Sequence, residues 1–272
     1  MQRRIDRWCL LLGVAAIAWL CATEVQAAGS RWVVILVGIP GEPSYEQKYK
    51  DTADAWVKSF VDDWKVPTEQ IIRPQTPLTA ASIEQTLGEL AKKLQPEDSF
   101  WLLTLGHGDH DGSQSRFHVS GRDPTGEDWP RWFADVRCRE QVIWFTHSSS
   151  GWLVKPVSKP GRVVIAATEA ADEVNETEFP HALAQVLQSP TKDSDADSDG
   201  QVSLAEFFTA TVKATNGRFA SDKRIPTEHA QLDDDGDGKG SESLPAAAPT
   251  NDPPTKQDGA VAHTIVLPWP TK

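Results

Sequence analysis

The sequence predicts an α/β protein in which a mostly parallel sheet lies between two layers of helices. Short apolar runs of strand length alternate along the chain with longer segments in which apolar residues recur at helical spacing. Strands that alternate with helices are joined by crossovers, and such strands lie parallel. Two polar loops directly follow apolar runs, which is the position where ligands bind in sheets of this kind.

Five short segments are predicted to be strands because they are rich in β-branched, aromatic and leucine side chains. Their apolar runs are nearly continuous rather than alternating, which indicates that both faces of the sheet are covered. In chain order they are residues 32–37, 70–72, 100–105, 141–145 and 163–167.

Five longer segments are predicted to be helices. In the first two, apolar residues recur three and four positions apart, as on one face of a helix. Thr79 is expected to cap the second helix, because its hydroxyl can accept a hydrogen bond from the first turn. In chain order the helices are residues 45–64, 79–94, 127–136, 178–187 and 204–214.

The chain is acidic, with a formal net charge of −12 and a pI near 5.0. Nucleic-acid-binding proteins usually carry a basic patch, and this sequence has none, so its composition argues against that class. The acidic residues gather at 193–199 and 233–237. Such clusters either stay solvated or hold cations.

The first 27 residues have the pattern of a signal peptide. A positively charged start precedes an uncharged apolar run at 8–21, and Val25-Gln26-Ala27 suits cleavage before Ala28. We therefore expect export, to the periplasm or the medium. The run is short for a membrane span, so none is expected after cleavage, although an uncleaved anchor is an alternative. Cleavage would leave Cys138 as the single cysteine, which excludes an internal disulfide.

The domain organisation follows from changes in composition. Residues 28–190 are predicted to form the α/β domain, and residues 191–240 to continue it as a calcium-binding segment. Residues 241–262 are rich in Pro, Ala, Ser and Thr, which is typical of a flexible linker. The tail at 263–272 could add an edge strand.

A calcium-binding loop of the EF-hand type is predicted from position 195 to position 206. Calcium takes six to eight oxygen ligands, and this pattern supplies carboxylates, a backbone carbonyl and a glycine for the sharp turn. The predicted ligands are Asp195, Asp197, Asp199, the backbone carbonyl of Gln201, Ser203 directly or through water, and Glu206. Because Pro190 should end the preceding helix, we expect a loop with only its exit helix.

A second acidic loop is less complete. Asp233, Asp235 and Asp237 would take the first three ligand positions, with Gly238 at the sharp turn. The position of the final ligand falls on Leu244, which cannot bind a cation. Both a second metal site and a plain acidic turn remain open.

The two polar loops resemble those of a known family. One places His107 and Gly108 after the third strand, and the other places Ser-Ser-Ser-Gly at 148–151 after the fourth. With the segments at 160–168 and 175–179, these motifs resemble the caspase-fold peptidases, and most nearly the legumain-like branch. The resemblance implies a three-layer α/β/α sandwich. It gives His107 the place of the catalytic histidine and Ser148 the place of the nucleophilic cysteine.

Serine at position 148 is a departure from that family, and it leaves three interpretations. A thiol ionises near pH 8.5, whereas a serine hydroxyl needs an oriented base within hydrogen-bond reach. First, the chain has lost peptidase chemistry and binds a peptide or protein. Second, it is a hydrolase with Ser148 as nucleophile and His107 as base, assisted by His147, Asp109 or His110. Third, other chemistry takes place, or the fold differs from the one that the resemblance implies. Separately, His107, Asp109 and His110 could bind metal or simply be exposed on a polar loop.

Other residues near these loops are weighed in the same way. Trp129, Trp132 and Trp152 could line a cleft for an extended ligand, but ordinary core packing is the favoured interpretation. Cys138 precedes the fourth strand, so it should lie at the opposite end of the sheet from His107 and cannot replace the missing thiol.

Overall fold

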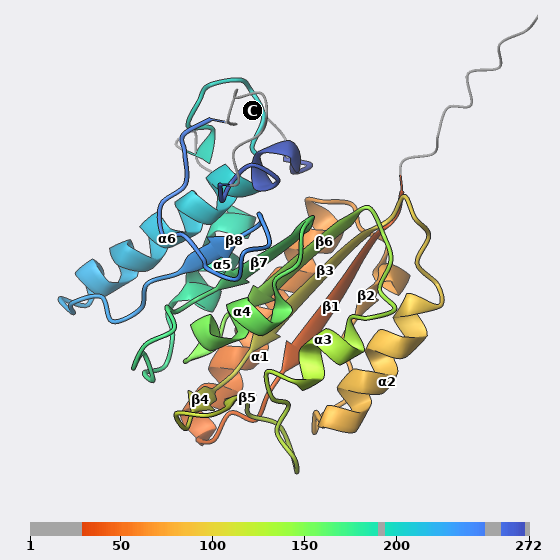
Figure 1. Cartoon of the computed structure of the whole chain (residues 1–272). Helices are drawn as coiled ribbons and strands as arrows, with labels where there is room; N and C mark the ends of the chain where they lie inside the picture. The colour runs from red at the N-terminus through yellow and green to blue at the C-terminus, as the bar shows by residue number, and fades with distance from the viewer. Residues whose placement is uncertain (1–28, 190–193, 248–256, 270–272) are drawn as a thin grey trace, which may run out of the picture.

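The computed structural model describes residues 29–189, 194–247 and 257–269 (Figure 1). The predicted signal peptide and Pro190 lie outside these ranges. One six-stranded sheet runs through the molecule in the order β2-β1-β3-β6-β7-β8, parallel except for β8. Its strands are β1 (Arg31–Val37), β2 (Ile71–Ile72), β3 (Ser99–Leu105), β6 (Glu140–Phe145), β7 (Arg162–Ala166) and β8 (Gln231–Asp233). A separate antiparallel hairpin consists of β4 (Gly108–His110) and β5 (Ser115–Phe117).

Helices cover both faces of the sheet, which confirms the predicted three-layer α/β fold. The apolar residues of α1, α5 and α6 pack on one face, and those of α2, α3 and α4 on the other. The helices are α1 (Pro43–Asp62), α2 (Ala80–Ala91), α3 (Asp128–Trp132), α4 (Val154–Val157), α5 (Phe179–Gln188) and α6 (Leu204–Ser221). None of the helices in the described ranges combines the length and apolarity needed to cross a membrane.

The central strands send alternate side chains into two separate cores. On β6, Val142 and Trp144 join the core beneath α1, α5 and α6, whereas Ile143 and Phe145 join the core beneath α2, α3 and α4. This alternation is the pleat of a strand, and both faces are apolar because both are covered. The continuous apolar runs of the sequence therefore have a direct structural cause.

The cap predicted for α2 is confirmed. The Thr79 hydroxyl accepts a hydrogen bond from the Ser82 N–H at 3.1 Å, and the Thr79 N–H donates to the Ser82 hydroxyl at 3.0 Å. This reciprocal pair satisfies two backbone donors that the helix itself cannot satisfy.

Three helices differ in length from the prediction. The helix expected at 79–94 ends at Ala91. The helix expected at 127–136 ends at Trp132, because the chain then continues in tighter turns, such as the bond from the Val136 N–H to the Phe133 carbonyl. The helix expected at 204–214 continues to Ser221. Its buried face extends through Thr215 and Phe219, and this packing outweighs the low helix propensity of Gly217.

The described part of the tail, residues 263–269, does not join the main sheet, whose edge is formed by β8. Residues Ala262–Thr264 form a 3₁₀ turn. The Leu204 N–H then donates to the Ile265 carbonyl at 2.8 Å, and the Leu267 N–H donates to the Val202 carbonyl at 2.9 Å. The expected edge strand is therefore a short pairing with the end of the predicted calcium loop.

Both described ends of the predicted linker are packed rather than free. Ser241 and Leu232 exchange two backbone hydrogen bonds, at 3.0 and 2.9 Å. The Ser241 hydroxyl donates to the buried carboxylate of Asp258 at 2.6 Å. Residues 248–256 of this segment lie outside the described ranges.

Candidate functional site

The two polar loops meet at the carboxyl edge of the sheet. His107 follows β3 and Ser148 follows β6, and these strands are parallel neighbours. The loops are tied directly to each other through Gly108 and Ser148. The two loops that follow apolar runs in the sequence therefore lie side by side in the structure.

The hydroxyl of Ser148 is bound to backbone. It donates to the Gly108 carbonyl at 2.9 Å and accepts from the Gly108 N–H at 3.1 Å. Only 2% of Ser148 is exposed. Within the described part of the chain, this hydroxyl has no hydrogen bond to a histidine.

His107 is held by oxygen atoms on both sides of its ring. Nδ1 lies 3.0 Å from Oε2 of Glu176, and Nε2 lies 2.9 Å from the Pro40 carbonyl and 3.1 Å from the Tyr49 hydroxyl. Tyr49 donates its own proton to Glu176 at 2.9 Å, so its oxygen is an acceptor for Nε2. The hydrogen bond to Glu176 raises the pKa of His107 most, and the Pro40 carbonyl raises it further, against the opposing effect of burial. This environment favours the doubly protonated ring.

His147 has the opposite environment. It is fully buried and stacks on Phe117 at a ring-centre distance of 4.9 Å. Its Nδ1 lies 2.9 Å from the Ser148 carbonyl, and its Nε2 has no hydrogen-bond partner within the described residues. Burial lowers the pKa of His147 to about 4, so the ring is neutral at physiological pH.

Two buried histidines predict a loss of stability in acid. Burial lowers the pKa of His147 to about 4 and that of His181 to about 3, whereas an unfolded histidine titrates near 6.5. The unfolded chain therefore binds more protons below pH 6.5, and stability falls as the pH falls from there towards 4. Between pH 7.5 and pH 5, the fall should be about 2 kcal/mol smaller in His147→Gln. Urea unfolding at both pH values measures it.

A matched substitution shows whether the change in acid stability is specific to His147 or follows from the removal of any histidine. His118 is partly exposed and pairs with Asp109 at 3.1 Å. His118→Gln should leave the fall caused by His147 in place. An equal fall in wild-type protein and His147→Gln would contradict the buried, neutral state of this ring.

The other residues proposed to assist catalysis lie on the β4–β5 hairpin, which was not predicted. Asp109 pairs with Arg116 at 3.0 Å as well as with His118. His110 stacks on Trp152 with ring centres 3.9 Å apart. Neither residue has a hydrogen bond to the Ser148 hydroxyl within the described chain.

The tryptophans divide between core and surface. Trp129 and Trp132 are buried in the core beneath α2, α3 and α4, as expected for ordinary packing. Trp152 is partly exposed and lines an open pocket of about 850 Å³, together with His110 and Glu169. Only Trp152 is therefore placed to contact a ligand there.

Cys138 lies where the sequence predicted, at the amino end of β6 and away from His107. Its thiol donates to the Glu140 carbonyl at 3.2 Å. Burial raises the pKa of Cys138 to about 11, so the unreactive thiol form dominates at neutral pH.

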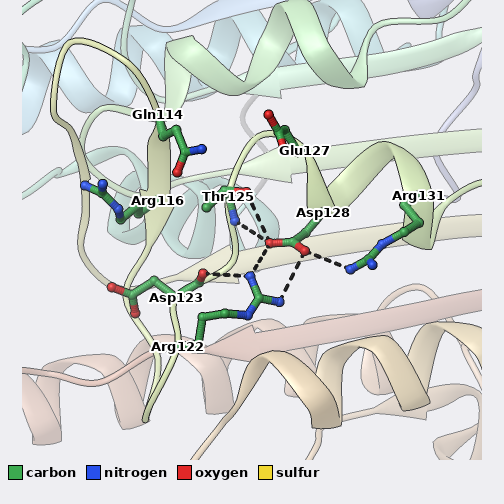
Figure 2. Close-up of a pocket in the computed structure, with 8 residues that line it drawn as sticks. All are labelled: Gln114, Arg116, Arg122, Asp123, Thr125, Glu127, Asp128 and Arg131. Atoms are coloured by element: carbon green, nitrogen blue, oxygen red, sulfur yellow. Dashed lines mark hydrogen bonds and ion pairs between the residues drawn. The ribbon is translucent and has the colours of Figure 1, made fainter.

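An arginine-rich pocket lies next to the hairpin. Figure 2 shows that Arg122 and Arg131 both turn to the carboxylate of Asp128, at 2.7 and 2.8 Å. Arg116, the third arginine, pairs with Asp109. The cationic charge in this pocket of about 560 Å³ is thus largely offset, and neither His107 nor Ser148 lines it.

The first three predicted calcium ligands are brought together. Asp195, Asp197 and Asp199 each offer one carboxylate oxygen, and these oxygens lie within 4.8 Å of one another. Oδ1 of Asp195 is shielded from solvent and has no hydrogen-bond partner in the described chain. Gly200 adopts φ +85°, the conformation for which glycine was expected.

The remaining predicted ligands close the loop. Oε1 of Glu206 accepts from the Ala196 N–H at 2.7 Å, and Oε2 accepts from the Ser203 N–H at 2.8 Å. The Ser203 hydroxyl also caps α6. Glu206 lies outside the three-aspartate group, and Gln201 donates its N–H to Asp199 at 2.7 Å. The loop has α6 as its exit helix, and α5 ends at Gln188, before residues 190–193, which lie outside the described ranges.

In the second acidic loop, the carboxylate group includes an aspartate from a distant segment, which the sequence pattern could not identify. Asp233, Asp235 and Asp258 have carboxylate oxygens within 4.8 Å of one another. Asp237 lies outside this group and accepts from the Lys239 N–H at 2.7 Å. Burial raises the pKa of Asp258 to about 6.

Comparison with known proteins identifies the fold. No protein-family model matches the chain, and no curated protein matches its sequence. Among solved structures, caspase-1 from Spodoptera frugiperda superposes with a TM-score of 0.50 at 9% identity. The match covers 76% of this chain and 87% of that one. The chain therefore has a caspase-like fold, and identity this low carries no function with it.

Proposed function

We propose that this chain is a calcium-binding protein whose caspase-like domain binds a peptide or protein without cleaving it. The observation that carries the loss of catalysis is the bonding of the Ser148 hydroxyl. Its single proton is donated to the Gly108 carbonyl and its oxygen accepts the Gly108 N–H, in a position that is 2% exposed. A serine nucleophile must instead give its proton to a base within hydrogen-bond reach.

Neither histidine supplies that base. A general base needs a free lone pair directed at the hydroxyl. Both ring nitrogens of His107 face oxygen acceptors, which hold protons on the ring. His147 is neutral, but its ring bonds to the Ser148 carbonyl rather than to the hydroxyl.

The acidic loop supports the calcium part of the proposal. Three carboxylates converge at 195–199, and the shielded Oδ1 of Asp195 lacks a partner within the described chain. A hard cation that prefers oxygen ligands would give Oδ1 of Asp195 a partner. It would also offset the repulsion among the three carboxylates. The donor set therefore fits calcium.

The pocket beside Trp152 supports the binding of a ligand. It is open and lies next to the two loops, and the stacked rings of His110 and Trp152 give it a flat face. Such a face suits the side chains and backbone of an extended peptide. Export through the predicted signal peptide completes the proposal.

A serine-directed phosphonate probe and a peptide library test the absence of catalysis. In calcium, the mature protein is expected to be labelled no more strongly than Ser148→Ala, and to cleave peptides no faster than that variant. Ser149→Ala is the matched control, because its hydroxyl is also buried and has no hydrogen-bond partner in the described chain. Labelling or cleavage lost in Ser148→Ala and kept in Ser149→Ala would establish the serine hydrolase instead.

The same peptide library, now immobilised, tests the binding of a ligand. Wild-type protein and Ser148→Ala are expected to bind the same peptides, and Trp152→Ala is expected not to bind them. If the wild-type protein bound no peptide of the library, the proposed peptide binding would be wrong.

A further inference from the structure

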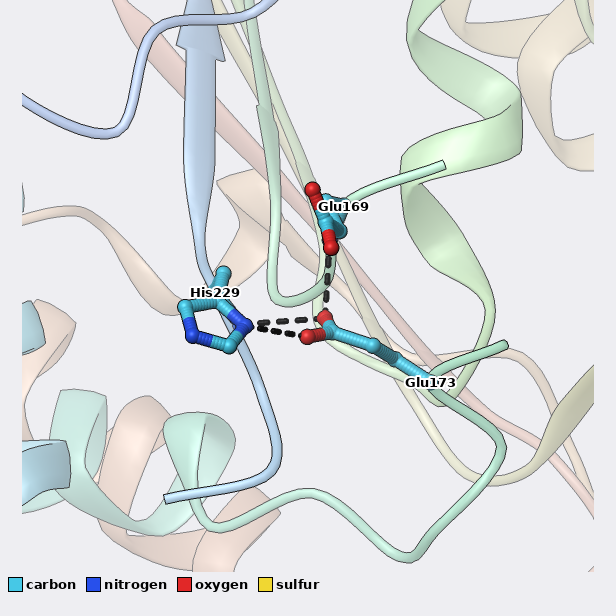
Figure 3. A group of neighbouring side chains, drawn as sticks. All are labelled: Glu169, Glu173 and His229. Atoms are coloured by element: carbon cyan, nitrogen blue, oxygen red, sulfur yellow. Dashed lines mark hydrogen bonds and ion pairs between the residues drawn. The ribbon is translucent and has the colours of Figure 1, made fainter. Parts of the chain in front are cut away.

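A third group of ligand-type side chains lies outside the acidic loops. Glu169 and Glu173 belong to the loop after β7, and His229 directly precedes β8 (Figure 3). One atom from each lies within 4.8 Å of the others. Figure 3 shows the two carboxylates turned towards each other, with Nδ1 of His229 facing Glu173.

In the described chain, no salt bridge joins a lysine or arginine to this group, although Lys155 and Lys239 line the same pocket as Glu169. Glu173 is 9% exposed. Oε2 of Glu173 accepts the Glu169 N–H at 2.9 Å and the His229 N–H at 3.0 Å. These bonds orient the carboxylate, and within the described chain the His229 imidazole is the only side chain that pairs with it.

The mixed donor set distinguishes this group from the aspartate loops. Calcium prefers oxygen ligands alone, whereas imidazole nitrogen together with carboxylate oxygen suits zinc and related ions. We propose that Glu169, Glu173 and His229 bind a divalent transition-metal ion of the zinc type. His229 is exposed and Glu169 lines the open pocket, so the ion can be reached from solvent and keeps a position for water.

Such an ion would join two segments directly, and through them a third segment at the carboxyl edge. The Glu173 carbonyl accepts the Ser149 N–H at 2.9 Å. The backbone of Glu169 packs tightly against Gly151, where an added Cβ would lie 2.2 Å from the Glu169 carbonyl carbon. Binding would therefore fix the loop that carries Ser148 to the segment before β8.

Zinc and cobalt titrations of the full mature protein, in saturating calcium, test this site. We expect one ion per chain that raises the Tm, with cobalt giving the visible absorption of a bound ion. His229→Ala and Glu173→Gln should each weaken zinc binding by at least about tenfold. Melting without metal checks that both variants fold.

Two matched controls separate this site from others. His118→Ala removes a histidine from another histidine–carboxylate pair, and Glu206→Gln alters the calcium loop. Both should keep zinc binding. The proposal would be overturned by absence of zinc binding to the wild-type protein, by undiminished binding in His229→Ala, or by loss of binding in Glu206→Gln.

Discussion

Glu206→Gln is expected to weaken calcium binding by at least about tenfold and to lower the Tm measured in calcium. The substitution removes one charged oxygen from the predicted ligand set. It also removes an acceptor from the pair of bonds that join the start of the loop to α6, through Ala196 and Ser203. At a hundredfold excess over Kd, calcium would add about 2.7 kcal/mol of stability, and a tenfold weaker site would retain about half of it.

Calorimetric titration and melting curves with and without calcium measure this effect. Glu89→Gln, an exposed glutamate on α2, is the matched control and should behave as the wild-type protein. If Glu206→Gln bound calcium as tightly as Glu89→Gln, the assignment of the loop would have to be abandoned.

Gly108→Ala is expected to destabilise the fold by about 1–3 kcal/mol, and to disturb the Ser148 loop at the same time. An added Cβ would lie 2.4 Å from Nδ1 of His147, and 2.7 Å from each of the carbonyl oxygens of Arg116 and Ser148. Two of these neighbours are backbone atoms of other segments, so relief requires the segments to move apart. Urea unfolding measures the cost.

Gly88→Ala provides the opposite case. Gly88 is exposed on α2, and no atom lies within 4 Å of its added Cβ. Alanine there should stabilise the helix by about 0.8–1 kcal/mol. Equal stability of Gly108→Ala and wild-type protein would show that the close approach of the two polar loops is not present in solution.

The central strands could be predicted because their signal is local. Each of β1, β3, β6 and β7 carries a continuous apolar run, and that run exists because both of its faces are buried. Strand β8 has no such run, since Leu232 is its single apolar residue. It pairs with β7 through contacts distant in sequence, and no local pattern reveals such contacts.

The candidate site could be predicted only in part, for a related reason. Parallel neighbouring strands place His107 and Ser148 at one edge, which follows from topology. The direction of the Ser148 hydroxyl depends on the backbone of Gly108, and sequence does not encode that orientation visibly. Glu176 and His229 were missed as partners because each comes from a distant segment, although Glu176 lies in a stretch that resembles the caspase-fold family.

The pairing of the tail with the acidic loop has a consequence for the order of assembly. The backbone groups of Val202 and Leu204 form hydrogen bonds with those of Leu267 and Ile265. The two tail residues leave the ribosome much later. A nascent chain that has already made the loop and α6 therefore still lacks the segment that closes them. The loop would have all its backbone hydrogen bonds only after the tail has docked. We therefore expect the calcium-binding loop to be among the last parts of the protein to fold.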